Sequence, residues 1–190
     1  MENTNQLNPN ESLKIISRVI NQTRENIKDQ SFYFLWWGWI ITIAAFGHYF
    51  LTVFSDTDNS HIPWIILIPI GWVGSIVYSI KKEKEKSYQT YFELFLKYLW
   101  IVLGISFMIS VFISLSLDVQ PAIFVLLLAG IGTLVSGLTM KFKPLIIGGL
   151  LFFIFAIGSL FVNQTTVLLL NAIAIVTGYL IPAYFLKNSK

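Results

Sequence analysis

Two histidines and two aspartates are the residues of this chain whose chemistry most resembles that of a metal site. They are His48, near the end of an apolar stretch, and then Asp56, Asp58 and His61 in the polar segment that follows. Imidazole nitrogens and carboxylate oxygens together suit a divalent metal ion. Their spacing matches no established ligand pattern, however, and solvated loops often contain these residue types. We therefore predict no metal site and no cofactor, and keep these four residues as the candidates for one.

The other polar side chains of interest lie inside apolar stretches. Three serines repeat every fourth residue, at Ser106, Ser110 and Ser114, and Asn171 stands in a later stretch. At this spacing the serines share one face of a helix, where small polar residues either pack against neighbouring helices or line a narrow polar conduit. The residue types favour a seam between packed helices, and the conduit is the alternative.

The sequence lacks the usual features of enzymes and of proton-coupled transporters. It contains no cysteine, which excludes thiol chemistry and disulfides. No Asp, Glu, Lys or Arg stands near the centre of an apolar stretch, where such residues mark ion paths and proton relays. No nucleophile and base pair up at a reachable interface. We therefore expect a protein that is not an enzyme.

A proline stands in the middle of the second apolar stretch. Pro69 lacks the amide hydrogen that a helix needs, and Gly71 follows closely, so we expect a kink. Kinks occur at gates and binding sites of transporters, yet membrane helices tolerate proline widely. We favour a purely structural bend here. Pro69 and Gly71 remain the candidates for a functional hinge.

Long apolar stretches must position all of these residues. The chain is 55% hydrophobic and 12% charged, which a soluble domain of 190 residues cannot bury. A membrane-spanning helix needs about 20 apolar residues. Six stretches have that length, at residues 32–54, 62–80, 95–117, 122–140, 145–162 and 167–186. We predict an all-α polytopic membrane protein, with six transmembrane helices in one compact bundle over residues 32–186.

The basic residues all fall on one side of this predicted bundle. Six alternating spans bring all 13 Lys and Arg residues together, whereas the opposite loops carry Asp56, Asp58 and Asp118. By the positive-inside rule both termini, including the short tail 187–190, are cytoplasmic. The net charge of +3 therefore describes a face in contact with membrane lipid, and we do not interpret it as nucleic-acid binding.

Residues 1–31 precede the first span as a polar segment. Asn8, Pro9 and Glu11 have the order of a helix cap, a first-turn proline and a capping carboxylate. Four apolar residues then share one helical face: Leu13, Ile16, Ile20 and Ile27. We expect an amphipathic cytoplasmic helix. It either lies on the membrane surface or on the protein's own loops, or it docks a cytoplasmic partner or a second copy of the chain.

Aromatic residues crowd the start of the first span. Six of them occur within eight positions, from Phe32 to Trp39. At 100° per residue they fall on all sides of a helix, whereas a stacking pocket needs them to converge. We interpret them as an aromatic belt at the cytoplasmic headgroups, with a groove for a lipid or a partner as the alternative.

Three segments of the chain carry a resemblance: DQSFYFLWWGWI, GIGTLVSGLTMKFKPLIIGGLLF and GYLIPAYFLK. Through them, and over its whole length, the chain resembles a family of small bacterial six-span inner-membrane proteins with no assigned activity. The family pattern has glycine where this chain has Ala183. The resemblance implies a bacterial inner-membrane location and the six-helix architecture, and it brings no catalytic residues.

Two functions fit these observations. We favour a non-enzymatic accessory or regulatory membrane protein that engages a partner through its N-terminal helix and through the basic loop from Lys81 to Lys86. The alternative is a small transporter or channel for a neutral or small solute, which the six spans, Pro69, the serine stripe and Asn171 would serve. A membrane enzyme ranks last.

Overall fold

The computed structural model describes residues 9–55, 59–85 and 90–188, and every secondary-structure element within these ranges is helical. The elements are α1 (Pro9–Phe54), α2 (Ile62–Glu85), α3 (Tyr91–Ser116), α4 (Pro121–Thr139), α5 (Lys143–Gly158), the short 3₁₀ turn η1 (Ser159–Phe161), α6 (Gln164–Ile175), the π-helical turn η2 (Val176–Leu180) and α7 (Ile181–Lys187).

Six helices are long and apolar enough to cross a membrane. They are Gln30–Phe54, Ile62–Lys82, Tyr91–Ser116, Pro121–Thr139, Lys143–Phe161 and Gln164–Lys187. The predicted all-helical fold and the predicted number of long apolar helices are thus confirmed. The largest difference in position is at the third helix, which begins at Tyr91 rather than at residue 95.

A capping box explains why α3 begins early. The Thr90 hydroxyl accepts a hydrogen bond from the Glu93 amide at 3.3 Å, and the Glu93 carboxylate accepts one from the Thr90 amide at 3.1 Å. Each side chain thereby satisfies an amide that the first turn of a helix leaves without a partner. The pattern T-Y-F-E was visible in the sequence, and it fixes the start of α3 more closely than hydrophobicity does.

Two helices end at non-glycine residues with positive φ. Lys141 (φ 52°) follows α4, and the amide of Phe142 donates to the carbonyl of Gly137 at 2.9 Å, which closes a Schellman motif. Asp118 (φ 53°) occupies the same position after α3. Both motifs reverse the chain within a few residues, so α4 and α5 form a tight antiparallel hairpin.

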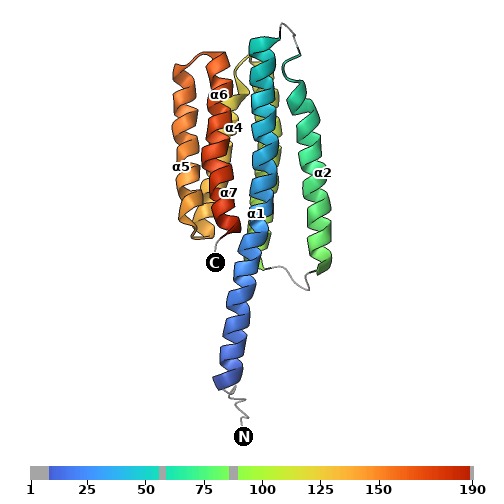
Figure 1. Cartoon of the computed structure of the whole chain (residues 1–190), viewed down its shortest axis with the longest axis vertical. Helices are drawn as coiled ribbons and strands as arrows, with labels where there is room; N and C mark the ends of the chain where they lie inside the picture. Colours follow the sequence, from blue (N-terminus) through green and yellow to red (C-terminus); the bar gives the residue numbers. More distant parts are fainter. Residues whose placement is uncertain (1–8, 56–58, 86–89, 189–190) are drawn as a thin grey trace.

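Helix α1 lies at the centre of the arrangement (Figure 1). It packs against α2 on one side and against α6, η2 and α7 on the other, while α3 packs mainly on α4. The hairpin α4–α5 is the closest pair. A Cβ atom on Gly149 would stand only 2.6 Å from the Leu134 Cα, and one on Gly137 only 2.7 Å from the Ile146 amide nitrogen. Small residues therefore bring these two backbones into contact.

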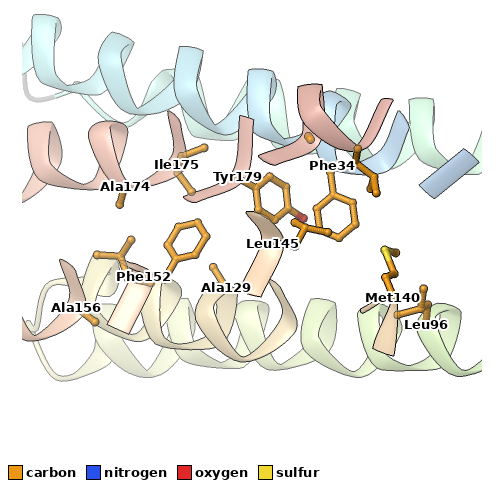
Figure 2. Packing of buried hydrophobic residues seen from close by; sticks show 13 residues of the cluster. Phe34, Leu96, Ala129, Met140, Leu145, Phe152, Ala156, Ala174, Ile175 and Tyr179 are labelled. Atoms are coloured by element: carbon orange, nitrogen blue, oxygen red, sulfur yellow. The ribbon is translucent and has the colours of Figure 1, made fainter. Parts of the chain in front are cut away.

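The buried core lies where α1, α5 and η2 meet (Figure 2). The Tyr179 ring of η2 packs between Phe34 of α1 and Phe152 of α5, with ring centroids 5.0 and 6.2 Å away. Gly148 of α5 faces the carbonyl oxygen of Gly178 so closely that a Cβ atom would overlap it. The π-helical turn thus sits against a glycine that leaves room for its backbone.

Candidate functional site

The first candidate site is the half of α1 that extends beyond the bundle. α1 is a single helix of 46 residues, and its N-terminal half runs past the ends of the other helices (Figure 1). The N-terminal helix and first span expected as separate segments, divided at residue 31, are therefore parts of one helix. Four predicted positions lie on the projecting half, and their side chains are outside the described part: Leu13, Ile16, Ile20 and Ile27.

Lysines gather at the end of the bundle from which α1 projects, which we call the basic end. Five of them are exposed there: Lys81, Lys84, Lys141, Lys143 and Lys187. Lys86, the last lysine of the predicted basic loop, lies outside the described residues. Among these side chains, Lys141 is held by its left-handed backbone at the turn between α4 and α5. A cation after the last turn of α4 also interacts favourably with the helix dipole.

Three tryptophans of the aromatic run use their indole N–H groups to connect helices. Trp36 donates to the carbonyl of Gly71 at 3.1 Å, and Trp37 donates to the hydroxyl of Ser75 at 3.0 Å, so both link α1 to α2. Trp39 donates to the Tyr184 hydroxyl of α7 at 3.3 Å. Phe34, from the same run, is 1% exposed. The run thus contributes to packing between helices as well as to the exposed surface that a belt requires.

Pro69 and Gly71 lie where α2 meets α1. α2 continues as a single helix through Pro69. Gly71 is buried, and a Cβ atom there would stand 2.9 Å from the ring of Trp37. The carbonyl of Gly71 accepts the Trp36 bond, so this part of α2 has a specific contact to α1. The proposed hinge therefore coincides with the place where α2 is attached.

The histidine candidates lie at the opposite end of the bundle. The Nδ1 atom of His48 accepts a hydrogen bond from the indole N–H of Trp64 at 3.1 Å, which joins α1 to the start of α2. His61 is exposed. Asp56 and Asp58 lie outside the described residues. Within the described ranges no group of three or more His, Asp or Glu side chains is close enough to hold a metal ion.

The serine stripe and Asn171 are divided between different helix pairs. Ser106 donates to the carbonyl of Val102 at 2.9 Å, within its own helix, and Ser110 is half-buried. Ser114 is fully buried on α3, which packs mainly on α4, whereas Asn171 is 3% exposed on α6, which packs mainly on α1. The main helix contacts therefore do not join the stripe and Asn171 into one lining.

Buried polar atoms without a hydrogen-bond partner occur on four helices. They are the Ser114 hydroxyl and the Asn171 carbonyl oxygen, together with the hydroxyls of Thr42, Thr133 and Ser136. The candidates predicted from the sequence did not include the hydroxyls of Thr42, Thr133 and Ser136. Thr133 and Ser136 lie among the glycines and alanines of the fourth apolar stretch, a pattern that indicates close helix packing. Thr42 is a single threonine in an apolar stretch and has no distinguishing context.

Comparisons of this chain with protein-family models, with curated proteins and with solved structures find no match.

Proposed function

We propose that this chain is a multi-pass protein of the bacterial cytoplasmic membrane that docks a partner protein through the projecting half of α1 and has no enzymatic activity. The observation that carries the proposal is the continuity of α1. A helix that leaves the bundle along the axis of a membrane span stands away from the bilayer, so it is available to a soluble protein. The projecting part, from Pro9 to residue 29, is about 30 Å long.

The proposed orientation places the basic end in the cytoplasm. Lysines and arginines are retained on the cytoplasmic side during insertion, and every basic residue of the chain belongs to the basic end or to the segment before it. Both termini are then cytoplasmic, and the predicted basic loop from Lys81 to Lys86 serves as a second contact for the partner.

The orientation can be tested by labelling single cysteines, because the natural chain has none. We expect Lys84→Cys to react with a membrane-impermeant maleimide only after the cells are opened, and Asn59→Cys to react in intact cells. Labelling of Lys84→Cys from outside would contradict the proposed topology and with it the cytoplasmic location of the projecting helix.

The docking role can be tested with full-length variants that keep the helix. We expect Ile16→Asp together with Ile20→Asp to abolish co-purification of the partner, because charge on the apolar face opposes burial. Matched variants on the other side of the helix, Asn21→Asp together with Gln22→Asp, should retain it. The absence of any partner with the intact protein, or equal effects of both pairs, would count against this function.

A second function has one observation in its favour. Polar atoms buried without partners are costly in a membrane, and they cluster in proteins that conduct polar solutes. If the chain is a small channel or transporter, Asn171→Leu should reduce flux of small neutral solutes into liposomes. The same substitution should leave flux unchanged and raise stability if Asn171 only packs.

A further inference from the structure

The first two turns of α2, residues 62–68, have little contact with the rest of the bundle; we call them the outer part of α2. No residue from position 62 to position 70 is buried, and the first buried residue of α2 is Gly71. The indole bonds from α1 to Gly71 and Ser75 hold the part of α2 that follows, which we call the attached part. The position of the outer part therefore depends on its own contacts with α1.

Pro69 separates the outer part from the attached part. A helical residue normally donates its amide hydrogen to the carbonyl four positions earlier, which is here that of Ile65. Proline has no amide hydrogen, and its ring presses on that carbonyl. Because a bend at this point breaks no hydrogen bond between Pro69 and Ile65, α2 bends there more easily than at a residue that donates one.

A hydrogen bond joins the outer part of α2 to the far end of α1. The indole N–H of Trp64 donates to the Nδ1 atom of His48 at 3.1 Å. Beside this bond Gly47 leaves room for Pro63, since a Cβ atom on Gly47 would stand 3.1 Å from the Pro63 Cγ. An indole nitrogen can only donate, so Nδ1 must carry no proton. The bond therefore requires a neutral His48.

Protonation of His48 removes this bond. A protonated imidazole carries a hydrogen on both ring nitrogens, so Nδ1 and the indole nitrogen would become two donors facing each other. Histidine ordinarily changes its charge between about pH 5 and pH 8. The bond is therefore present above the pKa of His48 and is lost as the pH falls through it.

Few other titratable groups lie near His48. Residues 62–77 of α2 include none, and neither does α6, which also packs on α1. The elements η2 and α7 contact α1 nearer the basic end, at Phe34 and Trp39. At the end of the bundle where His48 lies, the described titratable residues are Tyr49, His61 and Asp118, while Asp56 and Asp58 lie outside the described ranges. The charge of His61 acts on His48, so acid also adds repulsion between the two imidazoles.

We infer that His48 and Trp64 form an acid-sensitive latch that holds the outer part of α2 against α1. When His48 becomes charged, the bond is lost and the outer part swings away from α1 about Pro69. The outer part is about 10 Å long, so a bend of about 20° moves its tip by about 4 Å. The latch lies at the end of the bundle opposite the projecting half of α1 (Figure 1). It goes beyond the proposed docking role and needs only that the helices span a bilayer.

The test is a distance measurement by electron paramagnetic resonance on the spin-labelled full-length protein in lipid nanodiscs. The natural chain has no cysteine, so labels attach only where one is introduced. The first pair of labels is Ile62→Cys, at the tip of the outer part, with Ile154→Cys on α5. The control pair is Val77→Cys, on the attached part, with the same α5 label. All three positions are exposed. Each distance is measured at about pH 8 and at about pH 5.

Three variants identify the group that titrates. His48→Gln keeps a carbonyl oxygen that can accept the indole bond and does not titrate. Trp64→Phe removes the donor and leaves His48 in place. His61→Gln is the matched control, because it removes the other histidine and leaves the bond intact.

We expect acid to shift the distance from residue 62 by up to about 4 Å and to leave the distance from residue 77 unchanged. His48→Gln should abolish the shift, His61→Gln should retain it, and Trp64→Phe should show the acid distance already at pH 8. The latch would be overturned by a constant distance from residue 62, by an equal shift at residue 77, by a shift that depends on His61 instead of His48, or by a Trp64→Phe protein that behaves like the natural one. None of these outcomes bears on partner docking, which co-purification tests separately.

Discussion

Replacing Gly149 by alanine probes the closest contact of the bundle, between α4 and α5. The new Cβ atom would stand 2.6 Å from both the Cα and the amide nitrogen of Leu134. Non-bonded carbon atoms prefer a separation of about 3.5–4.0 Å, so the two helices must move apart by about 1 Å. Because the obstructing atoms belong to the backbone, no side-chain rotation can relieve the overlap.

The expected loss of stability follows from two opposing terms. Alanine is favoured over glycine inside a helix by about 1 kcal/mol. Overpacking a close contact costs about 1–3 kcal/mol, and the separated helices also lose dispersion contacts along their length. We expect Gly149→Ala to lower the free energy of unfolding by about 1–2 kcal/mol, which is roughly a tenfold change in the equilibrium constant.

Gly158 provides the matched control in the same helix. A Cβ atom there meets no other atom within 4 Å, so Gly158→Ala should leave stability unchanged or raise it. Both variants can be unfolded by titrating SDS into mixed micelles and followed by tryptophan fluorescence. Equal stability of the two variants would refute the close packing of α4 on α5.

Three further substitutions test single contacts. Lys141→Gly should raise the free energy of unfolding by about 1 kcal/mol in the same titration, because glycine adopts positive φ without strain; a decrease would contradict the left-handed turn. Trp64→Phe should cost about 0.6 kcal/mol, a typical hydrogen bond between membrane helices, and should cost nothing further in a His48→Leu background. Trp36→Phe should increase amide hydrogen exchange around Gly71 of α2 and leave that of α5 unchanged, as read by mass spectrometry.

Hydrophobic stretches predicted the long apolar helices well because a membrane-spanning helix needs about 20 successive apolar residues. Their ends depend on hydrogen bonds instead. α3 starts at Tyr91 because Thr90 and Glu93 cap it, although the apolar run begins later. The side chains change from polar to apolar at residue 31, yet α1 continues unbroken through this position. Its backbone hydrogen bonds do not depend on side-chain polarity, and no proline follows Pro9 before Pro63.

Contacts between helices could be predicted less well. The aromatic run was interpreted from its distribution around the helix, but the partners of Trp36 and Trp37 lie about 35 to 38 positions away, at Gly71 and Ser75. A single sequence gives no means of pairing them. The π-helical turn at Val176–Leu180 likewise packs on Gly148, which belongs to another helix.

Because α1 is one unbroken helix, its projecting half and its buried half would move together as a rigid rod. The closest contact of α1 with η2 is at Gly38, where a Cβ atom would be 2.6 Å from the Leu180 side chain, and about 25 residues, or nearly 40 Å of helix, separate it from Leu13. A tilt of about 10° about that point moves the free tip by about 6 Å. Trp36 and Trp37, whose indoles bond to α2, lie next to Gly38, so such a tilt would also move their bonds to Gly71 and Ser75.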